Sequence, residues 1–212
     1  MIPHPFPVNL DLRGRAALVV GSDADAIGRV ERLVRAGAHV RVLVRGEAPE
    51  ALCTLATGAS VHIETRAARP EDLEGVAVAY VATSEEAQAP PLHARALATG
   101  QLVCTVDRPE LSTFINPAVA TVGPLAITVS TGGVSPALAR RIRQDLEALF
   151  ASEPRFADWL QQLADERAAL PRGERAARGM EAVRGFALRG RLELPDVAGE
   201  APGPDPARAP SK

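Results

Sequence analysis

The first half of the chain alternates short apolar runs with segments of helical periodicity. Residues 16–21 (AALVVG) form an apolar run that ends in glycine, which is typical of a buried parallel strand. Residues 24–36 then place apolar side chains at helical spacing, and Gly37 supplies a stop signal. Valine alternates with other residues over 39–44 (HVRVLV). Together these segments have the length of one strand–helix–strand crossover.

The same alternation continues to about residue 107. We expect, in chain order, a helix over 49–57, strands over 60–65 and 76–83, a helix over 85–99 and a strand over 101–106. Strands that alternate with helices predict a parallel sheet with both faces covered. The predicted fold class is therefore α/β, with a Rossmann-type parallel sheet.

The pattern changes after Asp107. We expect a loop, an apolar strand, a helix and then a charged helical stretch, over 108–118, 125–130, 136–150 and 154–190. Ser135 followed by Pro136 is a typical helix start, with Ser as the N-cap and Pro at the first helical position. A tail rich in Pro, Ala and Gly follows, and this composition predicts disorder.

Charge and composition narrow the class of protein. The formal net charge is -2 with both signs spread along the chain, so there is no electrostatic footprint for nucleic acid. No apolar stretch approaches the about 20 residues that span a bilayer, and the N-terminus does not resemble a secretory signal. We therefore expect a cytoplasmic protein without nucleic-acid or membrane partners. Cys53 and Cys104 are too few and too far apart for a zinc site or disulfide framework, and we expect both thiols to be buried.

The turn after the first strand is the candidate nucleotide site. Rossmann domains place glycines there so that the backbone can approach a pyrophosphate at the helix N-terminus. This chain reads Gly21-Ser22-Asp23-Ala24-Asp25, with an aspartate at the second glycine position. A carboxylate repels a pyrophosphate unless it caps the helix instead. The turn alone therefore leaves nucleotide binding open.

The end of the second strand leaves the choice of cofactor open as well. An acidic residue at this position holds the ribose of NAD. Here the chain has Arg45-Gly46. Arg45 could pair with the 2′-phosphate of NADP, or it could be a solvated surface arginine.

Three later segments carry a specific family signal: Val106-Asp107-Arg108-Pro109, Phe114-Ile115-Asn116-Pro117-Ala118 and Ser130-Thr131-Gly132-Gly133-Val134-Ser135-Pro136. Together they resemble the precorrin-2 dehydrogenase family, which includes the N-terminal module of sirohaem synthase. The resemblance runs from about residue 5 to 150. It implies NAD-dependent oxidation of precorrin-2 to sirohydrochlorin, and in some members the insertion of ferrous iron into sirohydrochlorin.

The resemblance also implies a domain organisation and a homodimer. It places an NAD(P)-binding domain over 1–113 and a dimerisation region over 114–150. The remaining residues are expected to form a small helical domain over 151–194 and a disordered tail over 195–212. We expect a tetrapyrrole substrate and a second copy of the chain as partners, with ferrous iron as a further substrate in members that insert it.

Site residues follow from the same resemblance. It assigns catalysis to Asp107, although an aspartate before Pro109 is by itself more often a cap or turn residue. The expected cofactor contacts are Gly21, Ala24, Asp25, Arg45, Gly46 and Thr83. The expected substrate contacts are Asn116, Thr131, Gly132, Gly133 and Arg140. Histidines show no metal-ligand spacing, so no resident metal is expected.

Two other functions remain open because the first turn departs from the three successive glycines usual in the family. The chain could be a chelatase that has lost dehydrogenation, or a tetrapyrrole-binding protein without activity. A dehydrogenase of small substrates is disfavoured, because the catalytic His or Tyr-Lys pair expected of such an enzyme is not apparent in the sequence.

Overall fold

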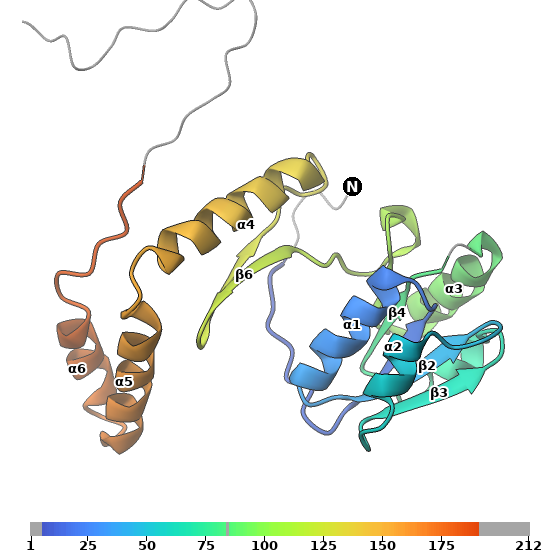
Figure 1. Cartoon of the computed structure of the whole chain (residues 1–212), viewed down its shortest axis with the longest axis horizontal. Helices are drawn as coiled ribbons and strands as arrows, with labels where there is room; N and C mark the ends of the chain where they lie inside the picture. Colours follow the sequence, from blue (N-terminus) through green and yellow to red (C-terminus); the bar gives the residue numbers. More distant parts are fainter. Residues whose placement is uncertain (1–5, 84, 191–212) are drawn as a thin grey trace, which may run out of the picture. The chain divides into compact units, whose positions relative to one another are not determined.

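The computed structural model describes residues 6–83 and 85–190, and five parallel strands form its main sheet (Figure 1). The strand order is β3-β2-β1-β4-β5. The strands are Ala16–Val20 (β1), His39–Val44 (β2), Val61–Thr65 (β3), Val78–Val81 (β4) and Val103–Thr105 (β5). This order, which reverses direction at β1, is that of a Rossmann domain. The α/β prediction is confirmed.

Helices and 3₁₀ turns connect the strands. They are α1 (Ala24–Arg35), α2 (Glu50–Leu55), α3 (Ala89–Thr99), η1 (Pro70–Leu73), η2 (Glu86–Gln88) and η3 (Pro109–Leu111). The predicted helix over 85–99 thus begins with a 3₁₀ turn. Pro90 and Pro91 lie in the first turn of α3, where no backbone donor is needed. No helix of the described residues has the length and apolar character required to cross a membrane.

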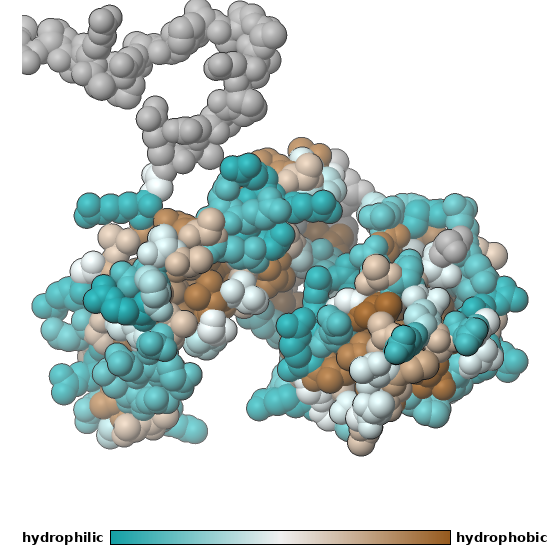
Figure 2. Space-filling view, in the orientation of Figure 1, coloured by the Kyte–Doolittle hydropathy of each residue, from teal (hydrophilic) through white to brown (hydrophobic). Residues whose placement is uncertain are grey.

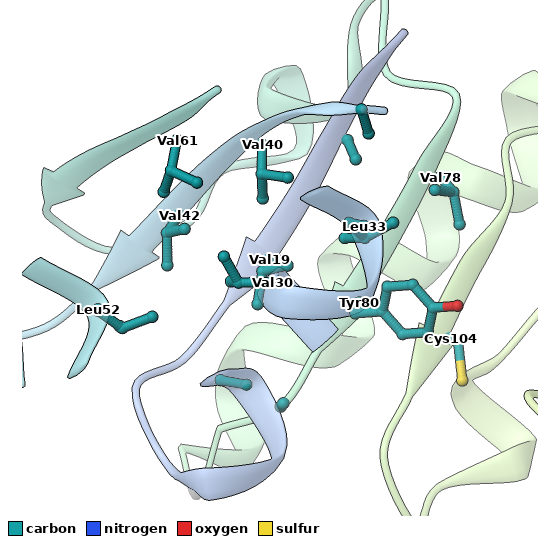
Figure 3. Packing of buried hydrophobic residues seen from close by; sticks show 14 of the residues in the cluster. Val19, Val30, Leu33, Val40, Val42, Leu52, Val61, Val78, Tyr80 and Cys104 are labelled. Atoms are coloured by element: carbon teal, nitrogen blue, oxygen red, sulfur yellow. The ribbon is translucent and has the colours of Figure 1, made fainter. Parts of the chain in front are cut away.

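Both faces of the sheet are buried, which explains the nearly continuous apolar runs of the strands. On one face, α1 and α2 cover the valines of the central strands, and Val30, Leu33 and Leu52 point toward them (Figure 3). On the other face, α3 and η1 pack against a second apolar cluster. The strand side chains of that cluster are Leu18, Val20, Leu43, Ala79, Val81 and Val103. With few aromatic residues, the core is built almost entirely from Val, Leu and Ala.

The outer edge of β5 is covered by the chain that follows it. The Val103 N–H donates to Thr113 Oγ1 at 2.9 Å, and the Thr105 N–H donates to Ser112 Oγ at 2.9 Å. The Thr113 N–H returns a bond to the Val103 carbonyl at 2.8 Å. The backbone donors of this short edge strand are therefore satisfied by hydroxyl groups.

A hairpin and a long helix follow the Rossmann sheet. Strands β6 (Ala118–Val122) and β7 (Leu125–Val129) pair antiparallel, and α4 (Pro136–Ala151) packs against them. The sequence pattern predicted β7 and α4 but assigned 108–118 to a loop and missed β6. The Ser135 side chain accepts from the Leu138 N–H, which confirms the predicted N-cap.

The first compact unit of the chain ends at Ala157 and the second begins at Asp158. The predicted helical stretch over 154–190 divides into α5 (Phe156–Ala169) and α6 (Arg175–Ala182), with Pro171 between them. In the second unit the rings of Trp159 and Phe186 stack with centroids 5.4 Å apart. The whole of the expected tail, 195–212, lies outside the described residues.

The two cysteines differ in exposure, so the prediction that both are buried was wrong for one of them. Cys104 is buried in β5, but Cys53 is exposed on α2. Helix α2 is short and buries Leu52, which turns the next side chain toward solvent. The Cys53 thiol contacts the Ala48 carbonyl at 3.7 Å.

An ion-pair network joins η1 to the segment that follows β3. The Asp72 carboxylate, with only 8% of its side chain exposed, receives both arms of the Arg66 guanidinium at 2.6 and 2.8 Å. It also accepts from the Arg69 N–H at 2.8 Å. The Arg66 fork is the main cause that lowers the pKa of Asp72, against the opposing effect of burial.

Replacing Asp72 should therefore destabilise the fold in a pH-dependent way. We expect Asp72→Asn to lower the free energy of unfolding at neutral pH by about 1–3 kcal/mol, because a charge-assisted fork is lost at a buried position. The pKa is lower in the folded state, so the stabilisation is present above 3.8, the ordinary Asp value, and is lost as the pH falls below it. Urea unfolding at neutral and acidic pH measures both effects.

The matched control is Asp11→Asn, which breaks an exposed pair with Arg13. It should change the stability by less than about 0.5 kcal/mol. Equal losses for the two variants, or a loss at Asp72 that is independent of pH, would contradict the assignment.

Candidate functional site

The carboxyl ends of the parallel strands meet at one edge of the sheet, and Gly21 is fixed at its centre. The Gly21 N–H donates to the Leu43 carbonyl at 2.9 Å, and the Ala82 N–H donates to the Val20 carbonyl at 2.8 Å. Gly21 has φ of 130°, and an added Cβ would lie 1.6 Å from the Ala82 oxygen. Only glycine allows β1 and β4 to approach this closely.

Asp23, at the second glycine position of the turn, caps the helix that follows. Its carboxylate accepts from the Ala26 N–H at 2.8 Å, so it is the N-cap of α1. In the described chain the N–H groups of Ala24 and Asp25 have no hydrogen-bond acceptor. The helix start therefore keeps two free donors for an anion, although one carboxylate already lies beside them.

The loops after β2 and β4 are joined by an ion pair. The Arg45 guanidinium lies 2.5 Å from the Glu85 carboxylate, across 40 residues of sequence. The Glu85 N–H donates to Thr83 Oγ1 at 3.2 Å. Gly46, with φ of 84°, turns the chain after Arg45. Sequence reasoning predicted Arg45, Gly46 and Thr83 but missed Glu85, whose only signal is a carboxylate two residues after Thr83.

Asp107 lies just beyond β5 at the same edge of the sheet. It has φ of 57°, and it is the only described non-glycine residue with positive φ. Aspartate tolerates this left-handed conformation better than most residues. Its side chain is exposed, and no described residue forms a hydrogen bond or ion pair with its carboxylate. The structure therefore presents a free carboxylate where ligands of open α/β sheets bind.

Asn116 is tied to the sheet rather than free in a loop. Its Oδ1 accepts from the Tyr80 hydroxyl at 3.2 Å, and the Tyr80 ring meets Phe114 edge-on at 5.6 Å between centroids. Burial raises the pKa of both the Tyr80 phenol and the Cys104 thiol, so both groups stay protonated near neutral pH. This cluster anchors the segment that leaves β5, with Asn116 held by a single side-chain bond.

The loop before α4 makes its hydrogen bonds internally. Thr131 Oγ1 accepts from the Ser135 N–H at 3.2 Å and donates to the Ser135 carbonyl at 3.1 Å. Gly132 and Gly133 have φ of 62° and 88°, values that disfavour other residues. The Thr131 hydroxyl thus shapes a tight glycine loop, and the two glycines leave its backbone uncovered.

The arginines at the start of α4 differ in their partners. Arg141 pairs with Asp145, and Arg143 pairs with Glu147, both one helical turn further on. Arg140 is exposed, and the described residues offer it no hydrogen bond or ion pair. It is therefore free to bind a carboxylate ligand.

The structure brings most of the predicted site residues together in two groups. Those at the carboxyl edge of the sheet are Gly21, Ala24, Asp25, Arg45, Gly46, Thr83 and Asp107. Asn116 is joined to that sheet through Tyr80. Thr131, Gly132, Gly133 and Arg140 lie in the segment between β7 and the first turns of α4.

Comparison with known proteins agrees with this geometry. Residues 8–118 match a family model described as putative NAD(P)-binding, and residues 122–149 match one described as sirohaem biosynthesis protein central. A siroheme synthase of Nitrosomonas eutropha is 36% identical over 144 residues, covering 68% of this chain and 30% of the relative. One of Gluconacetobacter diazotrophicus is 38% identical over 154 residues, covering 69% and 32%. The chain spans about a third of the length of these curated relatives.

A solved structure described as SirC, precorrin-2 dehydrogenase, aligns with a TM-score of 0.71 at 24% identity, covering 84% of this chain and 89% of that one. At this identity the likeness establishes the fold. The strand order and the glycine turn define the class as a Rossmann-type NAD(P)-binding protein. Within that class, the chain belongs to the siroheme synthase family.

The close approach at Gly21 predicts a large stability effect. Gly21→Ala should lower the free energy of unfolding by about 3 kcal/mol or more, because its Cβ would overlap the Ala82 carbonyl and its φ is unfavourable. Gly28→Ala in α1 is the matched control, since nothing lies within 4 Å of its Cβ. It should stabilise the protein by about 0.5–1 kcal/mol. Chemical unfolding measures both, and a tolerated Gly21→Ala would contradict the tight contact.

Proposed function

We propose that this protein dehydrogenates precorrin-2 to sirohydrochlorin with NAD as the hydride acceptor. The observation that carries the proposal is the free, exposed Asp107 carboxylate at the carboxyl edge of a Rossmann sheet. Family membership and the description of SirC as a precorrin-2 dehydrogenase support the choice of substrate. The reaction converts precorrin-2 and NAD⁺ into sirohydrochlorin, NADH and a proton.

The residues of the first turn fit a dinucleotide. Gly21 leaves the turn without a side chain, and the N–H groups of Ala24 and Asp25, at a helix N-terminus, have no acceptor among the described residues. When bound, the nicotinamide would accept the hydride. The Asp23 carboxylate stays engaged with the Ala26 N–H, which reduces its repulsion of the phosphates.

Asp107 acts as the general base in this proposal. A hydride can leave the macrocycle as a proton leaves a neighbouring atom, and the Asp107 carboxylate accepts that proton. Its backbone is fixed by the short strand β5 and the hydroxyl bonds on the edge of that strand. Arg140 would bind a carboxylate group of the tetrapyrrole, and Gly132 and Gly133 would let the flat ring approach the backbone.

A second reaction is proposed on the same carboxylate. Asp107 could accept pyrrole protons as ferrous iron enters sirohydrochlorin. The observation that favours this reaction is Asp23, which keeps a negative charge at the start of α1 and would weaken dinucleotide binding. Iron insertion would survive such weakening, whereas dehydrogenation would not.

The decisive assay mixes the protein with precorrin-2 and NAD and follows the absorbance of sirohydrochlorin. Asp107→Asn, which keeps a residue that tolerates the left-handed backbone, should lower kcat by about 100-fold or more. Asp145→Asn on α4, an exposed carboxylate of the same type, should leave the rate unchanged. A parallel assay with sirohydrochlorin and ferrous iron, without NAD, measures the second reaction. An active wild type with a fully active Asp107→Asn would refute the base assignment.

We also propose that the protein is a homodimer through the segment containing the hairpin and α4. Apolar side chains are exposed there: Val134, Leu138 and Ile142 are 75%, 51% and 37% exposed. Apolar surface is visible at the N-terminal end of α4 (Figure 2). Exposed apolar side chains grouped on one element are typical of an association surface.

The dimer predicts a specific change in mass. Light scattering should give twice the mass of one chain, and the double variant Leu138→Asp, Ile142→Asp should shift the protein toward one chain, because it places charges at an apolar contact. Gln144→Asp on the same helix adds a charge at a polar, exposed position and serves as control. A monomeric wild type would contradict the proposal.

A further inference from the structure

The position that normally selects between NAD and NADP carries the wrong charge for NAD in this chain. Rossmann domains that bind NAD place a carboxylate at the end of β2, where it accepts from the ribose 2′-hydroxyl. Arg45 is the residue after β2 here, and an arginine there suits the 2′-phosphate of NADP. Taken alone, Arg45 would therefore predict NADP.

The structure brings a carboxylate to the same place from another strand. Because β1 lies between β2 and β4 in the sheet, the Arg45–Glu85 pair joins the two loops that flank the end of β1. The Arg45 side chain is exposed, at 57%, and the Glu85 side chain is 38% exposed. The positive charge of Arg45 is thus neutralised where the ribose of a dinucleotide would lie.

Glu85 is held in this position by further contacts. Gln88 Nε2 donates to the same Glu85 Oε2 at 3.0 Å, and Gln88 Oε1 accepts from the Ala68 N–H at 3.1 Å. The Glu85 N–H is bound by Thr83 Oγ1. The carboxylate is therefore oriented from both its backbone and its side chain, which a freely moving surface glutamate would not be.

We propose that Glu85 is the cofactor-specificity residue of this protein. It supplies from the loop after β4 the carboxylate that is missing after β2, accepts a hydrogen bond from the ribose 2′-hydroxyl of NAD and holds Arg45 away from a 2′-phosphate. A dianionic 2′-phosphate would lie beside the Glu85 carboxylate and be repelled by it. The proposal rests on the proposed function only in requiring that a nicotinamide dinucleotide binds at this edge.

The test is a fluorescence titration of the full chain with NADH and with NADPH. Wild type should bind NADH more tightly. Glu85→Gln should increase the affinity for NADPH by about tenfold, since Arg45 becomes free to form a charge-assisted bond with the phosphate. The same variant should lower the affinity for NADH by about threefold, because the acceptor for the ribose hydroxyl is weaker. The double variant Glu85→Gln, Arg45→Gln should not show the increased affinity for NADPH.

Glu86→Gln is the matched control, because it removes the same charge one residue further on from a carboxylate that lies 3.8 Å from Arg108 instead. It should leave the ratio of the two affinities within about twofold of wild type. A Glu85→Gln variant with an unchanged ratio overturns this inference while leaving the dehydrogenase proposal standing. A wild type that prefers NADPH overturns this inference and the choice of NAD as hydride acceptor, but not the dehydrogenation of precorrin-2. A wild type that binds neither nucleotide overturns both.

Discussion

The closeness of two backbones at the end of β1 is the constraint on which the site depends. The last residues of β1 bond to β2 on one side and to β4 on the other, and Gly21 passes so near the Ala82 carbonyl that no side chain fits between them. This contact fixes the turn that leads into α1 and, with it, the direction of the helix N-terminus. It also brings the loops after β2 and β4 within reach of each other, so that Arg45 and Glu85 can pair.

The rest of the sheet holds this edge in register. Apolar side chains fill both faces of the central strands, and the strands therefore have little freedom to slide along one another. Near β3, the ion pair between Arg66 and Asp72 of η1 also helps to hold the strands in register. The backbone of Asp107 gains a defined position from this arrangement, although no side chain in the described part of the chain bonds to its carboxylate.

The sequence was sufficient to predict the parallel sheet and the residues at its carboxyl edge, because strands buried on both faces read as apolar runs and glycine marks the turns. Strand β6 was missed because it follows Pro117 and contains only Ala, Val and Thr; the Gly123-Pro124 turn was the available hairpin signal. The burial of Cys53 was predicted wrongly because a two-turn helix has too little buried face for both neighbours. Glu85 could not be found, since its role depends on a contact across 40 residues.

The covered edge of β5 limits how this protein can associate. Ser112 and Thr113 occupy the backbone donors that a foreign strand would need, so the sheet cannot be lengthened on that side by another chain. A second polypeptide that contacts this edge must instead bind through side chains. The same hydroxyl bonds that hold the segment after β5 thus also protect this edge from the intermolecular strand pairing that leads to aggregation.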